Sequence, residues 1–112
     1  MTQPDRRTAS PNAIGLVHQP AGRPTSDRYW VRGLVVRHAR DQRLRIVEVL
    51  ELEDDGQRNG YVLTRLAALA MQSDAAALLT HGVQLDLADK VADDLGVRHL
   101  PVPHTDRPQQ TE

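Results

Sequence analysis

YWVRGLVVRHARDQRLRIVEVLELE, residues 29–53, is the stretch that decides the predicted fold of the chain. Residues 29–38 and 44–53 are rich in the β-branched and aromatic side chains that favour strands. The polar residues 39–43 between them suit a turn. The sequence therefore predicts a β-hairpin.

A symmetric turn gives this predicted hairpin two different faces, because successive side chains of a strand point to opposite sides. One face suits the core and carries Trp30, Leu34, Val36, Leu44, Ile46, Leu50 and Leu52. The other mixes valines with charges and carries Tyr29, Val31, Val35, Val47, Val49, Arg37, Arg45, Glu51 and Glu53. This second face needs cover, either from a partner or from residues 14–17 or a helix of the same chain.

Helical patterns follow the hairpin. Leucines and alanines with helical spacing in residues 63–70 predict one helix. Ser73 is a candidate N-cap for a second helix over residues 74–80. A stripe at i, i+4 and i+8 in residues 87–95 predicts a third, which Asp86 would cap.

Glycine and proline predict how the chain ends its regular structure. Gly96 would end the third helix, and residues 97–100 could form a short strand. Pro101 and Pro103 would confine that strand to a sheet edge. The predicted fold is a small α+β domain, with an antiparallel hairpin or sheet packed against two or three short C-terminal helices.

The expected domain covers residues 28–103. Residues 1–27 hold four prolines and several small polar residues, which predicts a disordered tail. Residues 13–17 could instead be a docking or edge strand, although the composition favours an extended tail. Residues 104–112 are polar and are expected to fray.

Composition excludes several protein classes. The chain has 112 residues, a net charge of −1 and no cysteine, so it offers neither a disulfide nor a thiolate metal site. No apolar run is long enough to cross a bilayer, and the N-terminus lacks a signal-peptide pattern. We therefore expect a cytoplasmic protein without membrane contact. One lysine against thirteen arginines suggests a bacterial, high-GC genome.

Residue patterns do not predict an enzyme, a metal or a cofactor. The five histidines lack metal-ligand spacing and are expected at the surface or at helix ends. The acidic clusters lack the fixed positions of a calcium loop. The three serines lack a nucleophile motif. Catalysis is the least favoured function, and we expect no catalytic residue.

Partner binding is the function that the sequence favours. We expect a non-enzymatic regulatory accessory protein that binds a protein partner or forms a homodimer through the hairpin. Arg37 and Arg45 would steer the contact, and its residues would be Trp30, Val31, Val35, Val47 and Val49.

Nucleic-acid binding is the alternative. Four arginines gather near the predicted hairpin tip, and they are Arg37, Arg40, Arg43 and Arg45. Such a cluster could contact backbone phosphates. The net charge of −1 supplies no overall positive field for DNA or RNA. We therefore expect this function less than protein binding.

Overall fold

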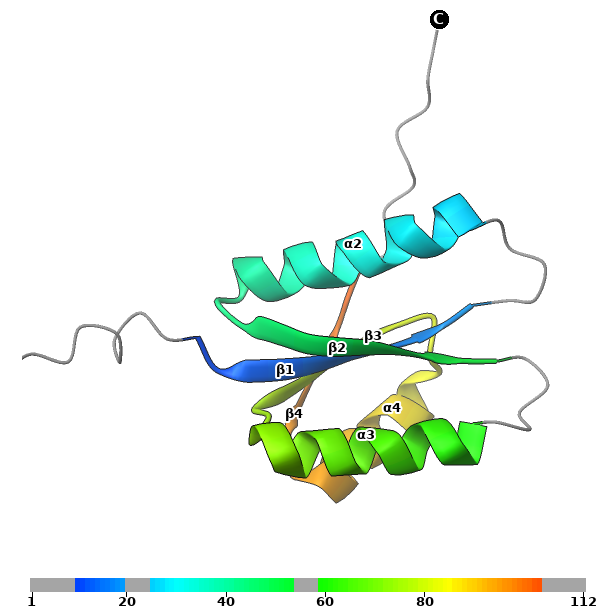
Figure 1. Cartoon of the computed structure of the whole chain (residues 1–112). Coiled ribbons are helices and arrows are strands. Elements are labelled where there is room, and N and C mark those ends of the chain that lie inside the picture. Colours follow the sequence, from blue (N-terminus) through cyan, green and yellow to red (C-terminus); the bar gives the residue numbers. More distant parts are fainter. Residues whose placement is uncertain (1–9, 20–24, 54–58, 104–112) are drawn as a thin grey trace, which may run out of the picture.

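The structure is a computed structural model that describes residues 10–19, 25–53 and 59–103. Strands and helices alternate along the chain (Figure 1). Their bounds are β1 Asn12–His18, α2 Thr25–Asp41, β2 Arg45–Leu52, α3 Asn59–Ser73, β3 Ala77–His81, α4 Leu85–Leu95 and β4 Arg98–Pro101.

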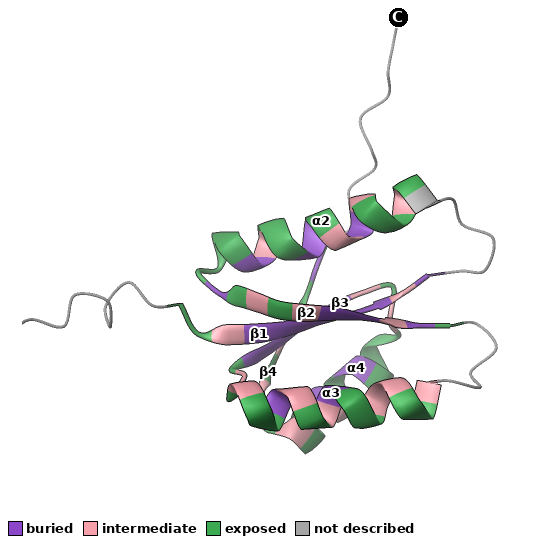
Figure 2. Cartoon of the chain, viewed as in Figure 1, coloured by how far each residue is buried: buried purple, intermediate pink, exposed green. Residues whose placement is uncertain are grey.

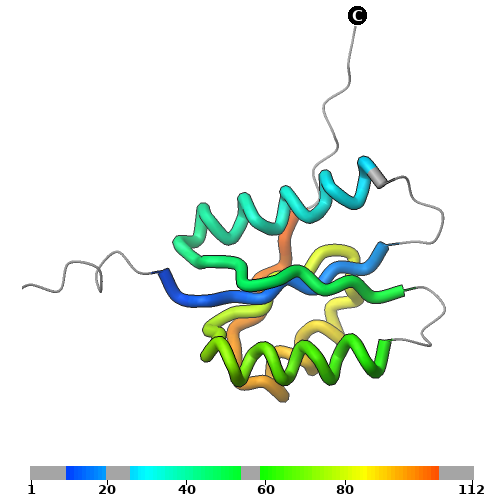
Figure 3. Tube along the Cα trace, viewed as in Figure 1, coloured from blue at the N-terminus to red at the C-terminus, as the bar shows by residue number. Residues whose placement is uncertain are grey.

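The four strands of the described residues form one parallel sheet in the order β2-β1-β3-β4. The helix α2 covers one face of the sheet, and α3 and α4 cover the other (Figure 1). The trace in Figure 3 shows the same three layers without side chains. Parallel neighbours need a crossover between them, which the interleaved helices provide.

The predicted antiparallel hairpin is wrong. Residues 29–38 lie inside the helix α2, and β2 pairs in parallel with β1. Val31, Leu34, Val35 and Ala39 are buried at i, i+3, i+4 and i+8, which is a helical stripe. The β-branched residues suggested a strand, but packing of this stripe on the sheet outweighs intrinsic propensity.

The expected N-terminal tail contains β1, one of the two inner strands of the sheet. β1 spans Asn12–His18, and residues 13–17 are all buried. A parallel strand covered on both faces has a continuous apolar run and no alternation, which is the pattern here. The remaining tail residues 1–9, 20–24 and 104–112 lie outside the described part of the chain.

Gly15 lets α2 approach β1 closely. A Cβ atom at this position would lie 2.9 Å from Val35 Cγ1 and 3.1 Å from Val49 Cγ2. Both distances are shorter than ordinary van der Waals contact. The glycine is therefore required by the packing of α2 across the sheet.

In the C-terminal half, two predicted helices and the final strand are confirmed. Residues 63–70 lie within α3, and residues 87–95 lie within α4. Gly96 ends α4 in the left-handed conformation at φ 72°, as its position suggested. The N-cap of α4 is Gln84, so the expected cap at Asp86 is wrong. β4 lies at the sheet edge.

The predicted helix over residues 74–80 is wrong. Ser73 is the last residue of α3, Asp74 turns the chain at φ 54°, and β3 follows at Ala77–His81. Residues 77–80 are consecutively buried, which is the pattern of a strand covered on both faces. The expected loop over residues 54–58 lies outside the described residues.

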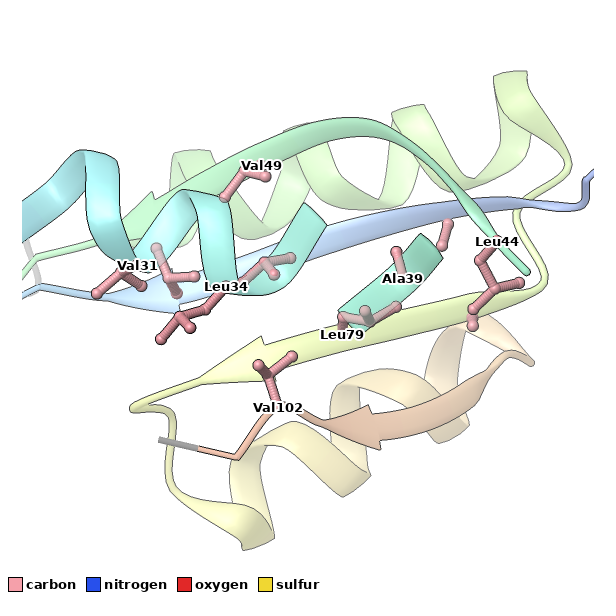
Figure 4. Close-up of a cluster of buried hydrophobic side chains, with 11 residues drawn as sticks. Val31, Leu34, Ala39, Leu44, Val49, Leu79 and Val102 are labelled. Atoms are coloured by element: carbon pink, nitrogen blue, oxygen red, sulfur yellow. The ribbon is translucent and has the colours of Figure 1, made fainter. Parts of the chain in front are cut away.

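Two apolar clusters hold the layers together. One lies between α2 and the sheet, and Figure 4 shows Val31, Leu34 and Val49 within it. The other lies between the sheet and the pair α3 and α4. Figure 2 shows the buried residues concentrated on the strands and on the inner sides of the helices. No helix in the described residues has the length and apolar character needed to span a membrane.

Candidate binding surface

Three of the five residues predicted to contact a partner are buried inside the molecule. Val31, Val35 and Val49 belong to the core cluster between α2 and the sheet, and Val35 is 0% exposed. Trp30 packs partly buried against the same cluster, whereas Val47 is 40% exposed on β2. The chain itself covers the valine-rich face, so this face is not a bare surface for a partner.

The structure places the predicted arginines around the end of α2, but Arg37 lines a different hollow from Arg40 and Arg45. Arg40 lies in the last turn of α2, Arg43 in the turn after it, and Arg45 is the first residue of β2. Arg37 lies one helical turn before Arg40, with its guanidinium carbon 5.9 Å from the centroid of the Trp30 ring. The arginines therefore share the end of α2 and the amino end of β2.

A hollow of about 660 Å³ opens beside Arg40 and Arg45. We name it the arginine hollow, and its lining is Ser10, Asn12, Val36, Arg40, Leu44, Arg45 and Ile46. The three aliphatic residues give it apolar surface, and the two arginines, the asparagine and the serine give it polar groups. Its volume falls within the roughly 300–1,000 Å³ of ligand and cofactor sites in proteins.

Arg45 is held in a fixed position within the arginine hollow. Its Nε and Nη2 atoms donate to Asn12 Oδ1 at 3.2 and 3.0 Å. The Nδ2 atom of Asn12 in turn donates to the carbonyl oxygen of Ser73 at 2.6 Å. A side chain that is already ordered loses less conformational entropy on binding. Sequence reasoning missed Asn12 because it placed residues 1–27 in a tail.

The charge of the arginine hollow is positive. No carboxylate lines it, and within the described ranges no carboxylate pairs with Arg40, Arg43 or Arg45. The negative end of the α2 dipole stabilises cations there and offsets part of their field. The combination of guanidinium groups and aliphatic surface suits an anionic group attached to an apolar body.

The outer edge of β2 is a poorer binding site than the sequence suggested. Arg32 Nη1 donates to the carbonyl oxygen of Val49 at 3.5 Å. Asn59 bonds both the backbone N–H and the carbonyl of Glu53, at 2.9 and 3.0 Å. A register shift of β1 on β2 also leaves Val47 without a partner residue. Side-chain cover and bulges both protect an edge against strand addition.

A hydroxyl, an imidazole and a carboxylate form a chain under α4. Thr80 Oγ1 lies 2.7 Å from His99 Nε2, and His99 Nδ1 lies 2.7 Å from Asp89 Oδ1. These groups have the order of a nucleophile, a base and its orienting acid. Thr80 is only 3% exposed, so its hydroxyl has no access to a substrate. The chain of bonds instead ties α4 to β3 and β4.

His99 was expected at the surface, but its side chain is only 9% exposed. No sequence signal could have found this network, because its three members are ten and nine residues apart. They meet only because parallel pairing aligns Leu78 with His99 and places Thr80 two residues further along β3.

Two further histidines, His18 and His81, lie at the carboxyl ends of the adjacent strands β1 and β3. Open parallel sheets often bind ligands at this place, where neighbouring crossovers leave in opposite directions. Among the described residues, no group of three metal-binding side chains occurs.

Comparison with protein-family models and with curated proteins finds no match to this chain. The arginine hollow is therefore interpreted from its own geometry and charge.

Proposed function

We propose that this protein is a small non-enzymatic regulatory accessory that binds an acidic macromolecular partner through the arginine hollow. The observation that carries the proposal is the composition of the hollow: aliphatic surface beside two guanidinium groups, with no carboxylate in its lining.

Interface energetics support this role for the arginine hollow. Arginine is enriched at the residues that dominate binding energy, and a neighbouring apolar surface excludes water from their contacts. Val36 was expected in the core but is exposed on α2, where it lines the hollow. Arg45 is pre-ordered by Asn12, and Arg40 extends from the last turn of α2. The hollow thus offers both an anchor and an apolar contact.

Protein capture from a native lysate tests the proposal. The full chain is compared with Arg40→Glu, which reverses one charge of the hollow and removes no hydrogen bond among the described residues. The matched control is Arg98→Glu, which reverses an exposed charge on β4, the opposite edge strand. We expect the same proteins to be captured by the parent chain and by the control, and to be lost from Arg40→Glu. Equal capture by all three chains would contradict the proposal.

Nucleic-acid binding remains a second candidate because four arginines lie close together along the chain around the end of α2. Arg37, Arg40, Arg43 and Arg45 come from α2, its turn and β2. Fluorescence anisotropy with single- and double-stranded DNA and RNA tests it. Each neutralised phosphate would make the slope of log K against log salt more negative by about 0.7–0.9. Binding that disappears in the double variant Arg40→Glu, Arg43→Glu would support this function, and no binding at low salt would remove it.

A further inference from the structure

The helix α4 presents an acidic face to solvent. Its buried side carries Ala88 and Ala92, and four of its seven exposed residues are aspartates. We name as the α4 acidic face the exposed residues Leu85, Asp86, Asp89, Asp93 and Asp94. Lys90 is the one exposed cation of the helix, and it pairs with Asp94 at 3.4 Å. The face therefore keeps a net negative charge.

Two of these carboxylates destabilise the helix that carries them. Asp93 and Asp94 lie in the last turn of α4, where the helix dipole is negative and acidic side chains are destabilising. Within the described ranges Asp93 has no ion-pair partner. A cation from outside the molecule would relieve this repulsion.

The α4 acidic face complements the arginine hollow in apolar character as well as in charge. Leu85 is 60% exposed at the start of α4, beside Asp86. The hollow offers aliphatic surface from Val36, Leu44 and Ile46 beside its arginines. An anionic helix with an exposed leucine is the kind of ligand that this hollow suits.

One copy cannot make this contact with itself. α2, which forms one wall of the arginine hollow, lies on one face of the sheet, and α4 lies on the other (Figure 1). The sheet separates the two surfaces. Within the described ranges, the two surfaces can therefore meet only between molecules.

We propose that the arginine hollow of one copy binds the α4 acidic face of a second copy. The inference rests on the proposed binding role of the hollow and names its occupant. Because the two surfaces differ, the contact is head to tail, and it generates a ring or an open chain. One helix face buries less than the roughly 1,200 Å² of a standard interface, so the association is weak and reversible.

Analytical ultracentrifugation of the full chain tests this inference. We expect a weight-average mass above the 12.5 kDa of one copy at low salt. The mass should return to that of the monomer as salt rises from about 0.01 M to about 1 M, because the Debye length falls from about 30 Å to about 3 Å. A monomer at every salt and protein concentration would overturn the inference.

Charge reversal identifies the two surfaces. Arg40→Glu with Arg43→Glu reverses one charge of the hollow and the neighbouring charge in the turn after α2. Asp93→Arg with Asp94→Arg reverses two charges of the acidic face. The second change places cations at a helix C-terminus, so it should favour folding of α4. Each variant alone should be monomeric. An equimolar mixture should associate again, because intact surfaces and reversed surfaces both form complementary pairs. Arg98→Glu should associate as the parent chain does.

The outcomes separate this inference from the proposed function. Association that both reversals leave unchanged, or a mixture that stays monomeric, would overturn the head-to-tail contact. A monomeric parent chain that still captures lysate proteins through Arg40 would retain the binding role of the hollow and remove only self-association. A parent chain that associates through Arg40 but captures no other protein would make the second copy its partner.

Discussion

The partly buried bond between Thr80 and His99 provides the sharpest test of the packing between α4 and the sheet. Nδ1 of His99 donates to the Asp89 carboxylate, so in the neutral ring Nε2 accepts from the Thr80 hydroxyl. Thr80→Val replaces that hydroxyl with a methyl group of similar size. His99 Nε2 then remains buried without its donor.

The expected cost follows from that unsatisfied nitrogen. A buried polar atom that loses its partner costs about 1–3 kcal/mol of unfolding free energy. A loss of 1 kcal/mol lowers the melting temperature of a domain of this size by about 4–8 °C. We therefore expect Thr80→Val to melt roughly 10 °C lower in thermal unfolding followed by circular dichroism, and urea unfolding should show the same loss.

The control is the same substitution at an exposed threonine. Thr64 Oγ1 bonds the carbonyl oxygen of Gly60 on the solvent side of α3, so Thr64→Val should change stability by no more than about 0.5 kcal/mol. Adding His99→Leu to Thr80→Val removes both partners, and this pair should recover part of the loss. Equal stability of Thr80→Val and Thr64→Val would refute the reasoning.

Two further predictions concern the packing of α2 on the sheet. Gly15→Ala should destabilise the fold by about 1–3 kcal/mol in urea unfolding, because the new methyl group overlaps Val35 and Val49. Gly33 lies on α2, and a Cβ atom there would meet no neighbouring atom within 4 Å apart from the backbone of its own helix. Gly33→Ala should therefore stabilise α2 by about 0.5–1 kcal/mol. Equal effects of Gly15→Ala and Gly33→Ala would contradict this packing. Val35→Arg should unfold the chain, because it places a charge in a fully buried position. A variant with parent-like circular dichroism would show that α2 does not bury this residue.

The sequence predicted the apolar stripes that lie on a single helix. The spacing of residues 87–95 and the glycine after them predicted α4 and its end, and the apolar spacing in residues 63–70 predicted α3. The prolines after Leu100 predicted an edge strand. These signals depend only on neighbours within a few residues, so tertiary contacts do not change their meaning.

The arginine hollow was only half predictable. Its arginines form an obvious cluster near a turn, and the structure keeps them together. Asn12 and Ser10 belong to a segment that composition assigned to a tail, and nothing local indicates that Asn12 holds Arg45. That contact spans 33 residues and exists only because β1 lies beside β2.

By itself the sequence determined where apolar residues gather, where two helices form and where the arginines cluster, because each depends on short-range order. Only the tertiary structure decided that residues 29–38 coil as a helix and that residues 12–18 form an inner strand of the sheet. A run of β-branched residues fits a strand or one buried side of a helix. The helix forms because it buries Val31 and Val35 against β1. Such long-range packing cannot be predicted from a short segment of sequence alone.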